Sequence, residues 1–238
     1  MKLADHDLLR DVCYIDGQWL AADSGQRIAV TNPATGEVLG HVPRMGADET
    51  RRAIAAAERA LPAWRALTAK ERAARLQAWF REIMAHQEDL ARIMTAEQGK
   101  PLAESRGEIA FAAAYLEFYA EEGKRIYGDV IPSPNADRRL LVTKEPIGVC
   151  AAITPWNFPS AMITRKAAPA LAAGCTLVLK PASQTPFSAL ALCVLAERAG
   201  IPPGVLSVVT GDSAAIGGEL TASPVAVSYT HLRAHETR

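Results

Sequence analysis

The sequence predicts an α/β fold built on a parallel sheet, because short apolar runs alternate with helix-length segments in its second half. The predicted strands cover about residues 147–153, 176–180 and 205–209. The predicted helices cover about residues 159–173, 187–199 and 213–221. Gly174 and Gly200 follow two of these helices, and glycine is the residue that most often ends a helix. Such alternation produces right-handed crossovers between parallel strands.

The composition is that of a soluble globular protein with a sizeable core. Of the 238 residues, 49% are hydrophobic and 22% are charged. Lys and Arg together number 26, as do Asp and Glu, so nothing indicates binding to nucleic acid or to an anionic membrane surface. No run approaches the roughly 18 apolar residues of a membrane span, and the polar N-terminus lacks the apolar core of a signal peptide. We therefore expect a cytoplasmic protein.

The N-terminal segment, residues 1–124, is predicted to contain short strands followed by helices. Residues 14–19 are predicted to form a hairpin with a tight Asp-Gly turn. Four helices are predicted at about residues 48–64, 68–85, 87–99 and 102–122. Thr68 and Glu71 form a capping-box pattern at the start of the second helix, and Gly99 is a stop signal for the third.

Residues 125–146 interrupt this pattern and are predicted to form a projecting hairpin. Extended segments at about residues 125–132 and 138–144 flank a turn that contains Ser, Pro and Asn. A two-stranded hairpin is marginally stable by itself in water, so we expect this one to pair with another element or with a second subunit. The sheet core is predicted to follow, over residues 147–226.

The four cysteines are Cys13, Cys150, Cys175 and Cys193. None belongs to a C-x-x-C pair or to a Cys/His cluster with zinc spacing, so we predict no metal site. The last three lie in apolar runs, where cysteine usually packs as a small hydrophobic residue. A reactive thiolate needs a partly exposed, electropositive setting, and the surrounding sequence predicts none.

Two polar turns follow neighbouring predicted strands and form the candidate site. The turns are Ile153-Thr154-Pro155-Trp156-Asn157 and Lys180-Pro181-Ala182-Ser183. Proline stiffens both turns, because its ring restricts φ. Ligands of parallel sheets bind at the carboxyl ends of the strands, so we predict that a cofactor and the reacting atoms lie here.

The polar residues of these turns each have a second interpretation. Lys180 can bind ribose hydroxyls or a phosphate, or it can be a solvated surface lysine. Ser183 stands where an acidic residue would repel a 2′-phosphate, so it permits NADP, but serine is also a common helix N-cap. Asn157 offers an uncharged NH₂ donor for an oxyanion, although asparagine is also frequent in turns.

Two further candidates have weaker signals. The segment from Gly211 to Gly217 lies between a strand and a short helix, where backbone N–H groups can bind a phosphate. Arg165 lies in the helix after the first turn and can hold a substrate carboxylate bidentately. From spacing alone it is more simply an exposed helix residue.

Taken together, these segments resemble the aldehyde dehydrogenase superfamily over about residues 12–227. The most specific parts are residues 153–159, 171–175, 180–185 and 200–206. Residues 97–101, 156–166 and 180–186 are most similar to succinate-semialdehyde and glutarate-semialdehyde dehydrogenases. The resemblance implies a Rossmann-like sheet that binds NADP or NAD, a small aldehyde substrate and a homo-oligomer. It also implies a mechanism in which a cysteine thiolate attacks the aldehyde and a glutamate activates water.

The resemblance implies a role for each candidate residue. The nicotinamide side of the cofactor would be lined by Ile153, Thr154, Pro155 and Trp156, and Asn157 would be the oxyanion donor. Lys180, Pro181, Ala182 and Ser183 would hold the adenosine ribose and its 2′ substituent, with Gly211 and Gly217 near the phosphates. Arg165 would bind the distal carboxylate of the substrate, and the hairpin of residues 125–146 would join the oligomerisation sheet.

The end of the sequence departs from the family pattern. We find no family counterpart for residues 227–238 and expect a disordered, unrelated tail, for example translated adapter sequence. The catalytic cysteine and general-base glutamate of the family have no match among these 238 residues. We therefore expect an inactive N-terminal fragment of a semialdehyde dehydrogenase. The alternatives are part of a dehydrogenase for another aldehyde, or a non-catalytic nucleotide-binding or oligomerisation module.

Overall fold

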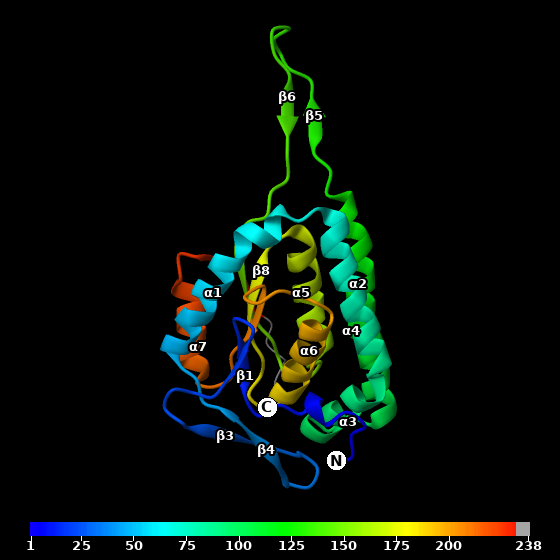
Figure 1. Ribbon diagram of the computed structural model, residues 1–238, viewed down its shortest axis with the longest axis vertical. Helices are drawn as coiled ribbons and strands as arrows, with labels where there is room; N and C mark the ends of the chain where they lie inside the picture. The colour runs from blue at the N-terminus through cyan, green and yellow to red at the C-terminus, as the bar shows by residue number, and fades with distance from the viewer. Residues whose placement is uncertain (232–238) are drawn as a thin grey trace, which may run out of the picture.

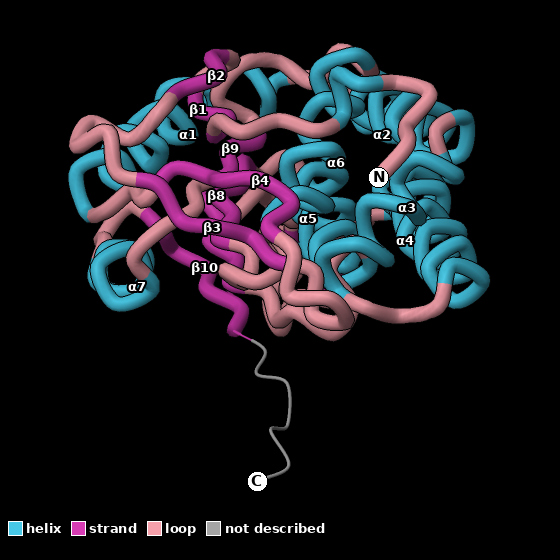
Figure 2. The backbone as a smooth tube through the Cα atoms, turned by 90° about the horizontal axis from the view of Figure 1, so that it is seen from below, coloured by secondary structure: helices cyan, strands magenta, loops and turns pink. Residues whose placement is uncertain are grey.

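A six-stranded sheet forms the centre of the molecule (Figure 1). The computed structural model describes residues 1–231. In spatial order the strands are β10 (Ala226–His231), β7 (Val149–Ile153), β8 (Thr176–Lys180), β9 (Leu206–Val208), β1 (Cys13–Ile15) and β2 (Gln18–Leu20). Helices cover both faces of this sheet (Figure 2), so the chain has the predicted α/β architecture.

Strands β7, β8 and β9 are parallel neighbours, as the sequence predicts. Ile153 lies opposite Lys180, so β7 and β8 end at the same level. Nearly every residue of these three strands is buried. Strands that are covered on both faces have no solvent-facing positions, which explains why they appear in the sequence as continuous apolar runs.

The predicted N-terminal hairpin forms and joins the edge of this sheet. Asp16 and Gly17 have φ values of 53° and 74°, as a type I′ turn requires at both central positions. Tyr14 of β1 pairs in antiparallel orientation with Val208 of β9. The hairpin therefore extends the parallel core into a mixed sheet, a placement that its local sequence does not reveal.

The opposite edge of the sheet corrects our expectation for the tail. We expected a disordered tail from residue 227 onward. Instead residues 226–231 form β10, which pairs in parallel with β7 across a register shift between Ala226 and Ser228. The exposed backbone groups of β7 favour this pairing, and Val, Tyr and Thr in the segment are good strand formers. The rest of the predicted tail, residues 232–238, lies outside the described residues.

Seven α-helices are distributed over three layers in the described chain. They are α1 (Ala47–Ala66), α2 (Ala69–Ala85), α3 (Gln87–Gln98), α4 (Leu102–Glu122), α5 (Ala161–Ala173), α6 (Pro186–Arg198) and α7 (Ser213–Ala222), with short 3₁₀ helices at His6–Leu8 and Gly123–Arg125. Helices α1 and α7 cover one face of the sheet, α5 and α6 cover the other, and α2, α3 and α4 pack outside α5 and α6 (Figure 1). Within residues 1–231, no helix has the length and apolar character needed to cross a membrane.

The predicted helix signals are confirmed by their hydrogen bonds. The Thr68 backbone N–H donates to the Glu71 carboxylate at 2.7 Å, and the Glu71 N–H donates to Thr68 Oγ1 at 3.2 Å. Gly99 and Gly174 follow α3 and α5 in the left-handed conformation, with φ of 92° and 93°. These signals are local, so the sequence is sufficient to predict them.

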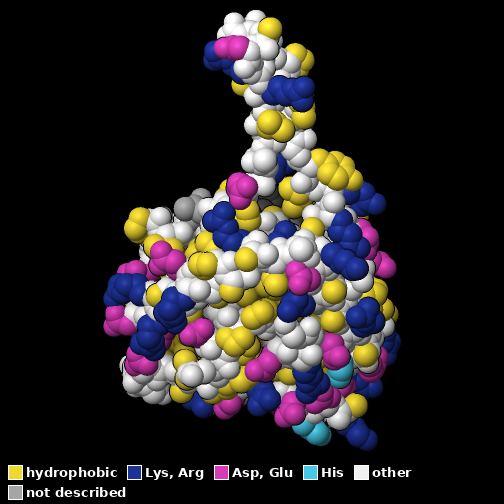
Figure 3. Space-filling view, turned by 45° about the horizontal axis from the view of Figure 1, so that its top comes forward, with side chains coloured by type: hydrophobic (Ala, Val, Ile, Leu, Met, Phe, Trp, Pro, Cys, Tyr) yellow, Lys and Arg dark blue, Asp and Glu magenta, His cyan; other side chains and the backbone are white. Residues whose placement is uncertain are grey.

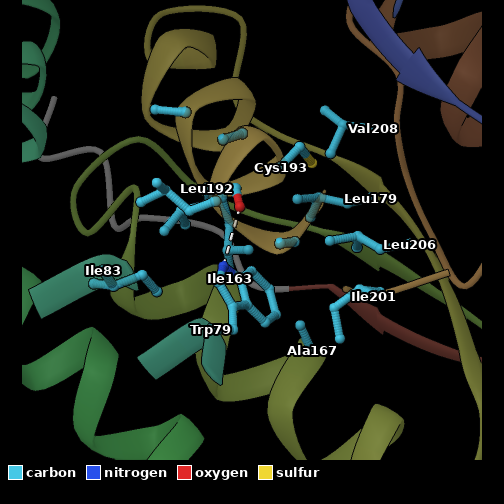
Figure 4. Close-up of a cluster of buried hydrophobic side chains, with 14 of the residues drawn as sticks. Trp79, Ile83, Ile163, Ala167, Leu179, Leu192, Cys193, Ile201, Leu206 and Val208 are labelled. Carbon is cyan, nitrogen blue, oxygen red and sulfur yellow. Dashed lines mark hydrogen bonds between the residues drawn. The ribbon is translucent and has the colours of Figure 1, made fainter. Parts of the chain in front are cut away.

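The main core lies between the sheet and the outer helices. Trp79 of α2 is fully buried, and its indole N–H donates to the Leu192 carbonyl of α6 at 3.1 Å. Figure 4 shows this indole within a cluster that includes Ile163 and Ala167 of α5 and Leu179 of β8. The tryptophan thus links an outer helix to the layer that covers the sheet, with its polar atom satisfied.

Two separate hairpins lie outside the central sheet. They are β3 (Arg27–Thr31) with β4 (Val38–Pro43), and β5 (Asp129–Ile131) with β6 (Leu140–Val142). The β5–β6 hairpin projects far from the body (Figure 3), and its Val130 and Leu141 are 74% and 72% exposed. In the described chain, β5 and β6 pair only with each other. Pairing of this hairpin with a second subunit stays a prediction.

Gly211 joins the segment before α7 to the segment before α1. Its φ is 139°, and a Cβ atom there would overlap the backbone N and O of Met45. The Met45 N–H donates to the Thr210 carbonyl, and the Asp212 N–H donates to the Met45 carbonyl, each at 3.0 Å. Glycine is required here because two backbones meet more closely than a side chain allows.

We predict that Gly211→Ala lowers the free energy of unfolding by about 2–3 kcal/mol, because the Cβ forces these backbones apart. Gly218→Ala is the matched control, since Gly218 lies within α7 with open space at its Cβ position. Alanine there should stabilise the helix by roughly 0.5–1 kcal/mol. Urea unfolding of both variants measures the difference, and equal effects would contradict the role of Gly211.

Candidate functional site

The two predicted turns lie side by side at the carboxyl edge of the sheet. Ile153 and Lys180 are paired residues at the ends of β7 and β8. The Thr154 N–H donates to the Lys180 carbonyl at 3.1 Å, so the pairing continues into the first turn. The structure therefore brings Ile153, Thr154, Lys180 and Pro181 together.

Lys180 is a buried residue, which makes the surface-lysine interpretation wrong. It is 3% exposed, and burial lowers the pKa of its ammonium group while the charge of Asp212 acts in the opposite direction. Its Nζ donates to the Pro181 carbonyl at 3.1 Å, its one hydrogen bond to the described chain. An ammonium group has three N–H donors, so Lys180 can bind additional acceptor atoms at the sheet edge.

Ser183 is not the N-cap of the following helix. Helix α6 begins at Pro186 and has Thr185 as its N-cap, and the Thr185 N–H donates to the Ala182 carbonyl at 3.2 Å. Ser183 therefore lies inside a tight turn, partly exposed, two residues before the helix boundary. One of its two interpretations is thereby removed, and the interaction with a ribose stays a prediction.

The Asn157 side chain does not behave as a turn-forming asparagine. In that role its Oδ1 would accept a hydrogen bond from a nearby backbone N–H. Asn157 Oδ1 is instead buried without a hydrogen-bond partner in the described chain. Buried polar atoms nearly always have partners, so this amide is available to an added group. Trp156, one residue earlier, is 39% exposed at the same turn.

Two buried glutamates bind the first backbone amides of the helices that follow these turns. Glu97 of α3 accepts from Phe187 N at 2.8 Å and Ser188 N at 2.7 Å, at the start of α6. Glu108 of α4 accepts from the first amides of α5. Neither role was predicted from the sequence. A usable signal was present, because each glutamate lies in a mostly apolar face of its helix and needs a partner there.

The environment of Glu97 raises its pKa to about 7. Burial is the main cause, because it penalises the charged form, while the hydrogen bonds from Ser188 and Phe187 act in the opposite direction. Glu97 is 2% exposed. Near neutral pH this carboxyl group is therefore divided between its two protonation states.

The first backbone amides of α7 are not free to bind a phosphate. Asp212 Oδ1 accepts from the Ala214 and Ala215 amides at 3.0 and 2.9 Å, so a carboxylate already occupies this helix end. Gly211 is needed for its contact with Met45. Gly217 lies farther along α7, where a Cβ would approach Ile153 at 3.8 Å. Of the two predicted glycines, Gly217 is the one beside the first turn.

Arg165 is exposed on α5. It lines a cavity of about 560 Å³ together with its neighbour Lys166, whose pKa is lowered by burial and then by the charge of Arg165. Cys150, Cys175 and residues 145–147 line the same cavity. The structure therefore brings two cations together but shows no contact between Arg165 and the predicted turns.

All four cysteines are buried, as predicted for Cys150, Cys175 and Cys193, and the environment of Cys175 differs from that of the others. Its pKa is lowered to about 6, first by a hydrogen bond from Cys150 and then by the backbone of Gly148 and Ile147. Cys175 is nevertheless 3% exposed, so its predicted burial as a small hydrophobic residue is confirmed. The contrast is Cys13, where burial raises the pKa to about 11.

The carboxyl edge of the parallel strands holds a buried lysine and a buried Asn157 oxygen without a hydrogen-bond partner in the described chain, and this edge is where α/β proteins commonly bind ligands. The chain belongs to the aldehyde dehydrogenase family, because the model of that family matches residues 19–230. The match passes residue 227, where we expected the family pattern to end.

Several relatives are similar along nearly the whole chain. Glutarate-semialdehyde dehydrogenase of Pseudomonas aeruginosa is 67% identical over 97% of this chain, and succinate-semialdehyde dehydrogenase [NADP(+)] GabD of Escherichia coli is 68% identical over 94%. 3-Sulfolactaldehyde dehydrogenase of Pseudomonas putida is 60% identical over 97%. A crystal structure of an E. coli NADP-dependent enzyme superposes with a TM-score of 0.95 and 67% identity over 96% of this chain.

The chain spans about half the length of the relatives that it matches. It covers 48% of the P. aeruginosa protein and 47% of each of the E. coli and P. putida proteins. It likewise covers 47% of the superposed crystal chain. The similarity therefore concerns about half of each of these proteins.

We predict that Glu97 makes stability depend on pH. Its pKa of about 7 exceeds the ordinary value of 4.5, so between these values the folded chain holds a proton that the unfolded chain releases. The free energy of unfolding should fall as pH rises through this window, by roughly 1 kcal/mol per pH unit, and Glu97→Gln should remove this contribution.

Urea unfolding at pH 5, 6, 7 and 8 measures this slope. Glu88→Gln is the control, because hydrogen bonds from Arg106 and then Arg92 lower the pKa of Glu88 to about 2. The contribution of Glu88 is lost only as pH falls through the range from about 4.5 to 2, below the tested window. An unchanged slope in Glu97→Gln would contradict the assignment.

Proposed function

We propose that this chain is the cofactor-binding part of an NAD(P)⁺-dependent dehydrogenase that oxidises a semialdehyde to the acid. The observation that supports this best is the edge formed by the ends of β7 and β8, where buried Lys180 lies beside the turn of Asn157. The unpaired Asn157 oxygen and the spare donors of Lys180 fit a polar ligand at this edge. The proposed activity and cofactor are further supported by the E. coli relative, which is named as an NADP⁺-dependent succinate-semialdehyde dehydrogenase.

Each residue of the two turns has a proposed role toward the cofactor. The nicotinamide side of the cofactor would be lined by Ile153, Thr154, Pro155 and Trp156. The adenosine ribose would be held by Lys180, Pro181, Ala182 and Ser183. The phosphates would lie near Gly217 and Gly211. Ser183 carries no charge that would repel a 2′-phosphate, so the turn accepts NADP⁺ as well as NAD⁺. Because Asp212 occupies the amides at the start of α7, Gly217 is the better phosphate neighbour of the two glycines.

The bound cofactor would accept the hydride, and the protein would orient the aldehyde toward it. Asn157 would donate its amide N–H to the oxygen that becomes negative when a thiolate adds to the aldehyde carbon. None of the four cysteines lies at this edge. Cys13 and Cys193 are buried with raised pKa values, and Cys150 and Cys175 line the Arg165 cavity. The 238-residue chain should therefore bind cofactor without oxidising an aldehyde.

The proposed substrate carries an anionic group at the end opposite the aldehyde. Succinate semialdehyde, glutarate semialdehyde and 3-sulfolactaldehyde, which appear in the names of three relatives, all have such a carboxylate or sulfonate. Arg165 and Lys166 place two cationic side chains at one cavity of about 560 Å³. A guanidinium binds both kinds of anion well. In the assembled enzyme the projecting β5–β6 hairpin would pair with another subunit.

We predict that the 238-residue chain binds NADP⁺ but does not reduce it. Isothermal titration with NADP⁺ should give saturable binding that weakens in Lys180→Met, which removes the ammonium donors at the sheet edge. Incubation with succinate semialdehyde and NADP⁺ should produce no absorbance at 340 nm. Steady turnover by the purified chain would contradict the absence of a nucleophile at this edge, and failure to bind either NADP⁺ or NAD⁺ would contradict the cofactor site.

We predict that Arg165 selects for the distal anion. The test uses a chimera that joins residues 1–225 to the remaining half of the E. coli relative, which is 68% identical over this part. Arg165→Ala should raise KM for succinate semialdehyde by about 10- to 100-fold, because hydrogen bonds to a charged group, which contribute about 1.5–3 kcal/mol, are lost. Butanal, which lacks the carboxylate, should be unaffected.

Arg81→Ala is the control for that experiment, because Arg81 is an exposed arginine on the outer helix α2. It should change neither KM value. If Arg165→Ala weakens both substrates equally, the selectivity for an anionic substrate is not due to this residue.

A further inference from the structure

Lys100, which has no role in the proposed reaction, anchors the backbone of Asn157. Lys100 follows Gly99 in the short loop between α3 and α4, and its side chain is 11% exposed. Its Nζ donates to the Asn157 backbone carbonyl at 3.0 Å and lies 4.4 Å from the centre of the Phe158 ring. The ammonium group therefore binds two consecutive residues of the first turn.

Glu108 completes this arrangement on the other side of the turn. Its side chain is 2% exposed, and Oε2 accepts from Lys100 Nζ at 2.5 Å. Oε1 accepts from Ser160 N at 3.0 Å and from Ala161 N at 3.2 Å, the first amides of α5. One buried ion pair thus spans the chain from Asn157 to Ala161.

The hydrogen bond from Lys100 restricts the orientation of the Asn157 side chain. The carbonyl that Lys100 binds and the side-chain amide share one Cα atom, so anchoring the former restricts the latter. The side chain itself has no such restraint, since Asn157 Oδ1 has no hydrogen-bond partner in the described chain. Displacements of about 1 Å in a reacting geometry can cost about 100-fold in rate, so a backbone anchor at this position has a measurable consequence.

We propose that Lys100 and Glu108 are positioning residues that aim the Asn157 amide at the reacting oxygen. This inference rests on the proposed function for the role of Asn157, but the orientation itself can be measured without catalysis. Glu97 supplies an internal comparison. It is also a buried glutamate and binds two amides at the start of α6, and in the described chain no hydrogen bond joins it to Asn157.

The first experiment observes the Asn157 side-chain NH₂ group in the ¹H–¹⁵N spectrum of the 238-residue chain. Its two peaks are assigned by their loss in Asn157→Asp. We expect Lys100→Met and Glu108→Gln to move these peaks toward the values of a freely rotating amide, and Glu97→Gln to leave them in place. Unmoved peaks in a folded Lys100→Met chain would overturn the proposal.

The second experiment measures kcat and KM in the chimera of residues 1–225 with the E. coli half. Lys100→Met should lower kcat by about 10- to 100-fold with little change in KM for NADP⁺. Lys100→Arg keeps the positive charge and should restore most of the lost kcat. Glu88→Gln should leave kcat close to that of the parent, because the exposed Glu88 carboxylate pairs with Arg92 and Arg106 on the outer helices.

The two proposals fail in different ways. An inactive parent chimera contradicts the proposed function, and the NMR experiment then decides whether Lys100 orients the amide. An active parent whose kcat is unaffected by Lys100→Met contradicts the positioning role alone. If Glu108→Gln does not fold, Lys100→Met/Glu108→Gln removes both charges together and should fold with the same loss of kcat.

Discussion

The arrangement of the candidate site depends on two buried carboxylates that bind the starts of helices. Glu97 binds the first amides of α6, and Glu108 binds those of α5. The first N–H groups of a helix have no partners within it and lie at its positive end, so a carboxylate is the favoured partner. Leaving one member of a buried ion pair without its partner typically costs about 3–5 kcal/mol. The outer helices therefore determine where both turns lie.

The sheet adds the second constraint, which is register. Because Ile153 and Lys180 are paired, β7 and β8 end together and their turns become neighbours. A shift of one residue would exchange the side chains that face the two helix layers, and close packing on both faces opposes this exchange. The layers then separate the groups by face, with α7 and Gly217 on one side of the sheet and α5 with its Arg165 cavity on the other.

Prediction from the sequence succeeded where the interacting residues are close in the chain. Thr68 recognises Glu71 three residues later, and the Asp16-Gly17 turn needs only its own two φ values. It failed where the partner is distant. Glu108 meets amides 52 and 53 residues away, and Lys100 binds the Asn157 carbonyl 57 residues away. Neither partner can be identified from local sequence.

The sequence by itself determined the order of helices and strands, the two polar turns and the family resemblance, because periodicity, proline and glycine act over a few residues. Only the tertiary structure decided that Lys180 is buried, that Asn157 is anchored by Lys100, and that β1 and β10 complete the sheet. The physical reason is the same in each case. Burial, ion pairing and strand pairing depend on which distant segments pack together, and packing is a property of the whole fold.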